Sequence, residues 1–476
     1  MKKCTASFGL LCSAALLTSA NAAYAVTLKQ TLIEAYKRSP EWAASIARKK
    51  VADESLAQSY SRWQPSVTAR YNVSGSREER KNHPLPEGSP TSKNLPNVYN
   101  NGLSVTLNQN LFDGFSTING IAAAEHNVFA ARSELVTAEQ QFFQRVIAAY
   151  LAVWEMRQRV EIAKKLVSNL ASDLHAAEKK FEVGTGTRPE IAAAKAQLAD
   201  AVYRHASAEA ALEAALAQFE AVTRIKPDAQ ITLPNIPENL PKSQEELIKL
   251  AQQFHPAIKG AQEKALAAHN SVSSTRGGLL PRVDVEVSAS TSRREERDKL
   301  GRSMFGQTTD RDTDSKTYSG NLVVSVPLLA NGSGGNLYSA SRRANQEALM
   351  AEMAYKKAML DVIAECVRVW NSFKAAETQL QQSKAAVESA EVAANGARQA
   401  AKYGLKSQTD VLYYEGKLLD SRNNAVEIQK NYVSMAYTTL SLIGRLTVPG
   451  LHLQVASYNP EGNESRARLA LPLVLK

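Results

Sequence analysis

Residues 160–181, VEIAKKLVSNLASDLHAAEKKF, contain the pattern that decides the fold. Apolar side chains recur there at spacings of three and four residues, with charged and polar residues between them. Because such positions lie on one face of a helix, this spacing is typical of a coiled-coil seam. The seam consists of Ala163, Val167, Leu170, Leu174, Ala177 and Phe181. The segment therefore predicts a helix that packs along its length against another helix.

The same seam occurs a second time, 220 residues further along the chain. Its members are Leu380, Ser383, Val387, Ala390, Ala394, Ala397 and Ala401. Two pairs of prolines repeat at a similar offset, Pro40 with Pro256 and Pro65 with Pro281. An offset of about half the chain is far longer than the repeat of a solenoid. The sequence therefore predicts two versions of one unit, an internal two-fold repeat.

Each half also contains two segments in which apolar and polar residues alternate. They follow Pro65 and Pro281 and recur at 103–107 and 322–326. A period of two is typical of β-strands, and strands of about ten residues suit a transmembrane sheet with an apolar outer face and a polar inner face. The charged segments 77–97 and 293–316, which join the paired strands, are expected to be exposed loops.

Helices account for most of the remaining sequence. The first long helix is expected from about residue 119 to 181, and at about 1.5 Å per residue it would be on the order of 90 Å long. Each half reads as helix, hairpin, long helix, helix. The other helices are expected at 28–62, 189–222, 244–275 and 409–446. The expected domains are a signal peptide at 1–25, repeat 1 at 26–226, a proline-rich linker at 227–242, repeat 2 at 243–448 and a weakly patterned C-terminal tail at 449–476.

The N-terminus has the features of a secretory signal. Lys2 and Lys3 precede an apolar stretch at 8–17, and Ala23-Tyr24-Ala25 forms a small-residue cleavage site. Cys12 follows two leucines instead of the small residue of a lipoprotein signal, so no lipid anchor is expected. No apolar stretch of about 18 residues follows, so entry into a membrane would have to use strands.

Composition argues against several classes of function. The formal net charge is +10, but the basic residues are dispersed among acidic ones, which does not suit a nucleic-acid surface. The seven histidines lack zinc-ligand spacing, and no nucleophile elbow or Rossmann fingerprint is present. We therefore expect no enzyme activity, no metal and no cofactor. Cys366, the one cysteine after the signal, is expected to be an inert core thiol.

Four strands cannot close a sheet on themselves. Open sheet edges do not survive in lipid, because unpaired backbone groups there cost several kcal/mol each. Bacterial barrels begin at about eight strands, so two, three or four copies of the chain could share one barrel.

Two glycine-containing runs sit where the long helices are expected to turn. They are Phe181-Glu182-Val183-Gly184, followed by Glu190-Ile191, and Tyr403-Gly404, followed by Asp410-Val411-Leu412. In this context the chain resembles the TolC family of outer-membrane efflux and type I secretion channels over almost all of its length after the signal. The second run departs from the family pattern, because its aromatic residue directly precedes the glycine.

The resemblance implies an α+β membrane protein that forms a homotrimer. Three copies would build a twelve-stranded β-barrel in lipid of the outer membrane and an α-barrel of coiled-coil helices crossing the periplasm. A periplasmic adaptor protein would dock at the tip of the helices, fed by an inner-membrane drug pump or an ATP-driven secretion transporter. The function implied is a passive exit duct for drugs or secreted proteins, and the cargo stays open.

The same resemblance implies a constriction near the two turns. Asp410 from three copies would form a ring of carboxylates, and a ring of that kind attracts cations. Tyr413 stands where relatives have a second acid. Arg188, Glu190 and Lys406 could form ion pairs between helices that hold the tube shut. The alternative is that these are solvated residues at a helix start, where Asp and Glu favour the positive end of the helix dipole. The adaptor would dock on Gly184, Thr185, Gly186, Thr187, Gly404, Leu405 and Ser407.

Two structural proteins compete with the duct. A coiled-coil surface adhesin or a periplasmic adaptor also uses long heptad helices. The duplicated strand pairs argue against both, because an adaptor needs a compact β domain and a fibre rarely repeats a strand-turn-strand unit.

Overall fold

The computed structural model describes residues 27–77, 80–82, 92–94, 96–226, 231–298, 311–328 and 333–469. The predicted signal peptide lies outside these ranges, as do residues 83–91 and 299–310 of the two predicted loops. The chain divides into two compact units. Unit 1 contains Met1–Ser39, Phe143–Glu238 and Ser372–Tyr437, and unit 2 contains Pro40–Phe142, Asn239–Asn371 and Thr438–Lys476.

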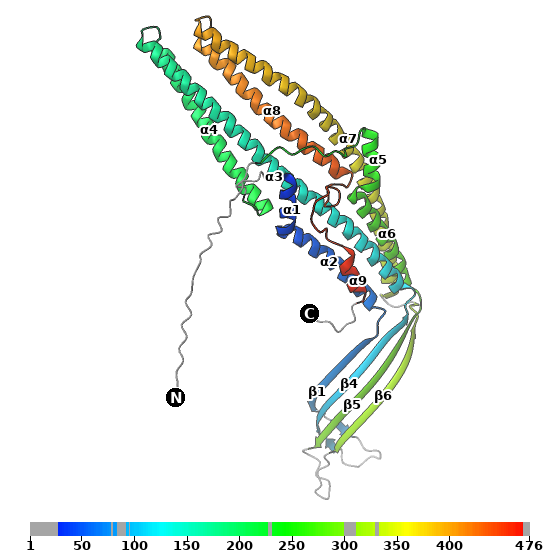
Figure 1. Ribbon diagram of the computed structural model, residues 1–476. Helices are drawn as coiled ribbons and strands as arrows, with labels where there is room; N and C mark the ends of the chain where they lie inside the picture. The colour runs from blue at the N-terminus through cyan, green and yellow to red at the C-terminus, as the bar shows by residue number, and fades with distance from the viewer. Residues whose placement is uncertain are drawn as a thin grey trace, which may run out of the picture. The chain divides into compact units, whose positions relative to one another are not determined.

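Unit 2 is built on a four-stranded antiparallel sheet (Figure 1). Its strands lie in the order β1-β4-β5-β6. Their bounds are Ser66–Arg77 for β1, Pro96–Phe112 for β4, Arg282–Asp298 for β5 and Arg311–Ser325 for β6. A short hairpin of β2 (Arg80–Asn82) and β3 (Ser92–Asn94) extends from β1 and β4.

The strands are longer than the alternation alone predicts. Residues 293–298 and 311–316 were expected in a loop, but they continue the β5–β6 ladder as far as the pair Glu296 and Arg311. Arg293 faces Asp314 and Glu296 faces Arg311 in this stretch. Diagonally across the strands, Arg293 Nη2 lies 3.1 Å from Asp312 Oδ2. Cross-strand pairs of opposite charge stabilise a ladder, so this charged segment continues as strand instead of forming a loop.

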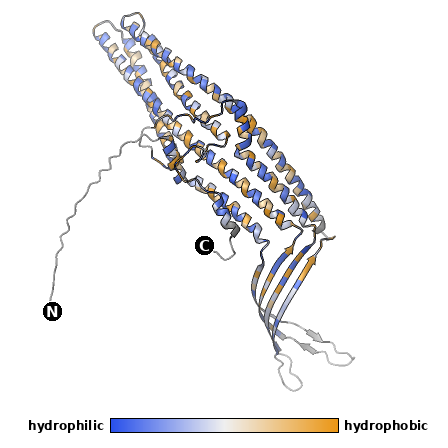
Figure 2. Ribbon diagram, turned by 45° about the vertical axis from the view of Figure 1, so that its right-hand side comes forward, coloured by the Kyte–Doolittle hydropathy of each residue, from blue (hydrophilic) through white to orange (hydrophobic). Residues whose placement is uncertain are grey.

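The register gives the sheet one apolar and one polar face. Val67 pairs with Leu107, which pairs in turn with Val287. One residue along, the row is hydroxylated: Thr68, Thr106, Ser288 and Ser319. The Oγ atoms of the two serines are 2.7 Å apart. Figure 2 shows apolar residues interspersed with polar ones along the strands.

Two helices that the periodicity predicts as continuous are broken by proline. The expected helix 28–62 consists of α1 (Leu28–Arg38) and α2 (Pro40–Ser61), and the expected helix 244–275 of α5 (Gln244–Phe254) and α6 (Pro256–Gly277). Ser39 and His255 have extended backbones, with ψ of 121° and 124°. Proline has no N–H and disfavours helical geometry in the residue before it, so each helix ends there and a new one begins.

The long helices confirm the coiled-coil prediction. α3 spans Ser116–Glu182 and α7 spans Ser333–Lys402, each followed by a shorter helix, α4 (Arg188–Thr223) and α8 (Gln408–Leu442). The seam residues Leu170, Ala394 and Ala397 are buried. α8 ends four residues before the predicted 446. Gly444, at φ +71°, reverses the chain there, because this conformation suits glycine.

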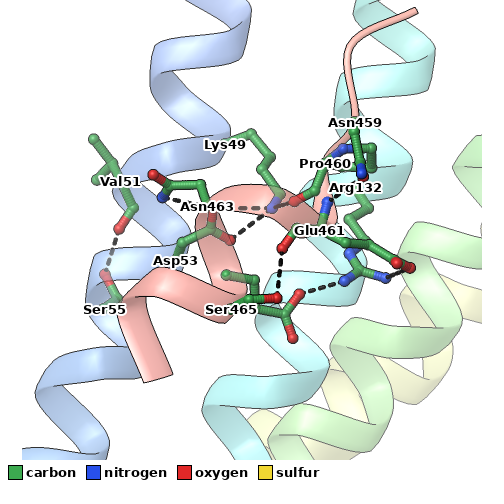
Figure 3. Close-up of polar contacts among 11 residues, drawn as sticks. Lys49, Val51, Asp53, Ser55, Arg132, Asn459, Pro460, Glu461, Asn463 and Ser465 are labelled. Carbon is green, nitrogen blue, oxygen red and sulfur yellow. Dashed lines mark hydrogen bonds and ion pairs between the residues drawn. The ribbon is translucent and has the colours of Figure 1, made fainter. Parts of the chain in front are cut away.

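The tail contains a helix that no sequence pattern predicted. α9 (Glu461–Leu469) ends a segment, residues 443–469, that we term the C-terminal strap. Figure 3 shows it against α2 and α3. Lys49 and Asp53 of α2 form a buried ion pair of 2.8 Å, and the Asp53 carboxylate also accepts a 3.0 Å hydrogen bond from Asn463 of the strap. Lys49 donates as well to the carbonyl oxygen of Pro460.

Two further anchors hold the strap to α3. Arg132 binds Glu464 and lies 3.4 Å from Glu461. Higher on α3, the buried carboxylate of Glu139 accepts a 2.9 Å hydrogen bond from the Val448 backbone N–H. In each anchor a charged side chain of α2 or α3 forms a hydrogen bond or an ion pair with the strap. These directional contacts fix the position of the strap.

Candidate functional site

The first candidate site is the turn between α3 and α4 in unit 1. Gly184 has φ of +77°, a left-handed conformation that favours glycine. Its N–H donates to the carbonyl of Phe181 at 3.0 Å, and the N–H of Thr185 donates to the carbonyl of Lys180 at 2.8 Å. These two bonds form a Schellman motif, which satisfies carbonyls left open at a helix C-terminus.

The turn between α7 and α8 repeats this motif atom for atom. Gly404 has φ of +73°, its N–H donates to Ala401 at 3.2 Å, and the N–H of Leu405 donates to Ala400 at 2.9 Å. The duplicated sequence motif therefore encodes a duplicated backbone turn, at an offset of 220 residues.

The acidic candidates cap the helices that follow. Glu190 Oε2 accepts from the Thr187 N–H at 3.0 Å, and Asp410 Oδ2 accepts from the Ser407 N–H at 3.0 Å and from its hydroxyl at 2.7 Å. Hydrogen bonds from Ser407 lower the pKa of Asp410 below its ordinary value. Asp410 is therefore charged and oriented at the first turn of α8, where a negative charge also suits the helix dipole.

The two turns differ in chemistry at position 186 and its equivalent, 406. A Cβ added to Gly186 would lie 2.9 Å from the backbone nitrogen of Phe181, so this turn has no room for a side chain there. The second turn carries Lys406 at the equivalent position, with its Nζ 4.2 Å from the ring centroid of Tyr414. Tyr413 packs edge-on against Tyr414 and stays exposed. The second turn thus presents a cation held over an aromatic ring.

Arg188 and Lys406 form no ion pair with another residue in the described part of the chain. Both are exposed, as are Glu190, Asp410 and Tyr413. Ion pairs between these groups on neighbouring helices therefore stay a prediction. Their exposure leaves all five side chains accessible to a second molecule.

Apolar side chains are exposed at both turns. Val183 is 74% exposed, Tyr403 79% and Leu405 80%. Of these three apolar residues, sequence reasoning named only Leu405 as a docking residue. Since the seam ends at Phe181 and Ala401, an apolar residue just beyond it has no helix to cover it, and this signal could have identified the other two. We define the tip surface as Val183, Thr185, Thr187, Tyr403, Leu405 and Ser407.

Ion pairs that sequence reasoning missed fasten α8 to α7 behind the turn. Arg398 Nε lies 2.6 Å from the buried Glu415, and Arg422 Nη2 lies 2.6 Å from Glu391. Asp173 of α3 lies close enough for its pKa to be raised, first by burial and then by Glu415. Neutralising one member of this group would weaken the contact between α8 and its neighbours.

No group of three His, Cys, Asp or Glu side chains in the described ranges could hold a metal ion. Within those ranges no helix has both the length and the apolar character needed to cross a membrane.

Comparison with known proteins identifies what the chain is similar to. The family model for outer membrane efflux proteins matches residues 31–223 and 247–445, one stretch in each repeat. Outer membrane efflux protein BepC of Brucella suis biovar 1 is 29% identical over 457 residues, covering 95% of this chain and 92% of that protein. Outer membrane protein TolC of Vibrio cholerae is 23% identical and covers 92% and 95%.

Solved structures share the fold. The Campylobacter jejuni CmeC outer membrane channel gives a TM-score of 0.73 at 17% identity, covering 93% of this chain and 89% of that one. The Vibrio cholerae outer membrane protein VceC gives 0.69 at 20% identity, covering 88% and 96%.

Proposed function

Because the chain belongs to the outer membrane efflux protein family, we propose that three copies of it assemble into one duct, docked on a periplasmic adaptor protein and supplied by an inner-membrane pump. The family consists of outer-membrane channels, so the chain works in the outer membrane and extends into the periplasm as an exit duct. Neither the adhesin nor the adaptor alternative fits this family. The duct acts passively, without a catalytic step or a cofactor.

The two-faced sheet is the observation that carries the proposal. Along the apolar face, side chains such as Tyr71, Val105 and Tyr318 are exposed, and lipid suits them. The opposite face carries hydroxyl and amide groups, which suit a water-filled passage. Among the described strands, β1 and β6 each pair on one side only. Unpaired backbone groups are costly in lipid, so the edges need strands from other copies, and three copies give a closed sheet of twelve strands.

The turns supply the narrow end of the proposed duct. Three copies of Asp410 around one axis would form a ring of fixed negative charge, and the Ser407 bonds keep that carboxylate ionised. Because Tyr413 stands where relatives have a second acid, the duct would have one ring of carboxylates instead of two. Its preference for cations is therefore expected to be modest. Asp410→Asn should lower the cation preference of the channel in planar bilayers. Glu190→Gln, a matched change at the other turn, should leave it nearly unchanged if Asp410 is the innermost group.

The tip surface is the proposed docking site for the adaptor. It is small, uncharged and partly apolar, which suits a helical hairpin with complementary apolar side chains. The test places a cysteine at Thr187 in a Cys366→Ala background and cross-links in cells. A matched control places it at Asp361, which is exposed on α7 in unit 2. Capture of an adaptor by Thr187→Cys alone supports the proposal, and capture of nothing overturns tip docking.

The adaptor that Thr187→Cys captures would indicate the cargo, because drug pumps and secretion transporters use different adaptors. Among similar proteins, one is called an efflux protein and another, AprF of Pseudomonas aeruginosa, an alkaline protease secretion protein. We favour a general duct that serves both kinds of cargo. Deleting the gene should then both raise drug susceptibility and remove proteins from the medium. Loss of only one of these would restrict the duct to that cargo.

A further inference from the structure

A cavity of about 340 Å³ opens in unit 2 where three segments of the chain meet. These segments are α3, the break between α5 and α6, and the first residues of the C-terminal strap. The lining includes the cations Arg132, Lys259 and Arg445, and no carboxylate of the described residues lines it. A cavity of this size can hold a small organic molecule, and its charge suits an anion.

Two close backbone approaches set the walls of this cavity. Gly444 of the strap lies against the end of α5, because a Cβ added there would be only 2.7 Å from the carbonyl oxygen of Phe254. Gly260 of α6 lies against α3, where an added Cβ would be 3.3 Å from the Cβ of Ser133. The strap, α6 and α3 are therefore held together at this point, and their side chains converge on a fixed space.

Two of the three cations have no acidic partner. Within the described ranges neither Lys259 nor Arg445 forms an ion pair, and both are exposed. Lys259 Nζ lies 5.3 Å from the ring centroid of Phe254, a contact that leaves its charge unneutralised. Lys259 also stands near the start of α6, whose first turn contains no acidic residue. Because the N-terminus of a helix is itself positive, positive charge accumulates on this side of the cavity.

The third cation, Arg132, has a hydrogen-bond donor to spare. Its two Nη atoms contact Glu461 and Glu464 of the strap (Figure 3). Its Nε atom is buried and has no hydrogen-bond partner among the described residues. A buried donor without an acceptor costs free energy, and native proteins usually supply one. Since Arg132 lines the cavity, an anion bound there can provide the missing acceptor.

We propose that this cavity binds an organic anion, a phosphate or carboxylate group joined to a flat apolar body. The anionic group would lie between Lys259 and Arg445, since guanidinium and ammonium groups form short, charge-assisted hydrogen bonds with both kinds of oxyanion. The apolar body would lie against Pro256 and the ring of Phe254, which is 41% exposed. The inference concerns unit 2 alone and does not depend on the proposed assembly.

Calorimetric titration of the detergent-solubilised protein tests this site. The probes are phenylphosphonate, benzoate, inorganic phosphate and, as a neutral control, benzyl alcohol. Low salt is used because ions screen exposed charges, and a titration into detergent alone is subtracted. At least one aromatic anion should bind saturably and more tightly than inorganic phosphate, and benzyl alcohol should not bind. The tighter of the two aromatic anions then distinguishes a phosphorylated ligand from a carboxylated one.

Three variants locate the binding. Lys259→Gln and Arg445→Gln each remove one cation of the cavity and should weaken binding about tenfold, the loss expected for a hydrogen bond to a charged group. The matched control is Lys249→Gln, which removes an exposed cation of α5 outside the cavity and should keep the original affinity. Melting temperatures without ligand show that each variant is folded.

Several results would overturn the proposal. Equal weakening by all three variants would mean that the anions respond only to the net charge of the protein. Unchanged affinity in both cavity variants would place the binding elsewhere, and no binding of either aromatic anion would remove the site. Inorganic phosphate that binds as tightly as phenylphosphonate would contradict the role given to Phe254 and the apolar body.

Discussion

Glu139 should make the stability of unit 2 depend on pH. The side chain is only 8% exposed, and burial raises its pKa from 4.5 to about 7, opposed by the hydrogen bond from Val448. Between these two values the unfolded chain ionises while the folded chain stays protonated. The contribution to stability is therefore complete below pH 4.5 and is lost as the pH rises to about 7.

The size of the effect follows from the shift. At 1.36 kcal/mol per pKa unit, the difference between 4.5 and about 7 corresponds to roughly 3 kcal/mol at pH 8. Glu139→Gln cannot ionise but keeps a carbonyl oxygen for the Val448 N–H. Relative to the unaltered protein, we expect the variant to gain about 3 kcal/mol at pH 8 and almost nothing at pH 4.5, where the folded carboxyl is neutral and the unfolded carboxyl is only half ionised.

Guanidinium unfolding of the detergent-solubilised protein, followed by circular dichroism at 222 nm, measures this difference. Glu161→Gln, on an exposed face of the same helix, is the control and should show no trend with pH. A Glu139→Gln effect that is equal at pH 4.5 and pH 8 would refute the reasoning, because it would mean that the carboxyl is not held neutral by burial.

Three further outcomes are expected. Gly184→Ala and Gly404→Ala should each destabilise the fold by about 1 kcal/mol, because φ is +77° and +73° at these positions and a side chain strains that conformation. In the same thermal melts Gly396→Ala should stabilise the fold by up to about 1 kcal/mol, because Gly396 lies inside α7 and nothing is near its added Cβ. The Cys366 thiol, buried and with a pKa raised to about 11, should resist Ellman's reagent at pH 8 until the protein unfolds. Lys49→Met should cost about 3–5 kcal/mol in chemical unfolding, because it strands a buried carboxylate.

The sequence predicted the elements that depend on long, simple periods. A period of two along residues 67–73 was enough to place a strand, and the register then assigned its apolar face. The seam at 160–181 predicted a helix whose bounds differ from the observed ones by only a few residues. Such patterns succeed because burial along a whole face requires every residue of that face to be apolar.

Features that depend on single residues were harder to predict. Pro40 and Pro256 mark the repeat, and each also breaks a helix because proline restricts the residue before it. The apolar period continues across both breaks, so it predicts one helix where there are two. α9 has only nine residues and little apolar character, and it docks through Asn463 and two glutamates. Polar contacts between residues more than 300 positions apart leave no periodic trace in a sequence. The place of Glu190 and Asp410 at the start of a helix was foreseen as an alternative, but their capping hydrogen bonds to Thr187 and Ser407 were not.

The strap also sets the order in which the protein can be completed. Lys49 is synthesised 411 residues before Pro460, whose carbonyl it binds. At about 5–20 residues per second, roughly 20 to 80 seconds separate the two on the ribosome. During that interval Pro460 and Asn463 have not been synthesised, so the Lys49–Asp53 ion pair of α2 cannot yet make its contacts with the strap. A chain cut short before residue 460 would keep both repeats but leave the Lys49–Asp53 ion pair without its contacts to Pro460 and Asn463.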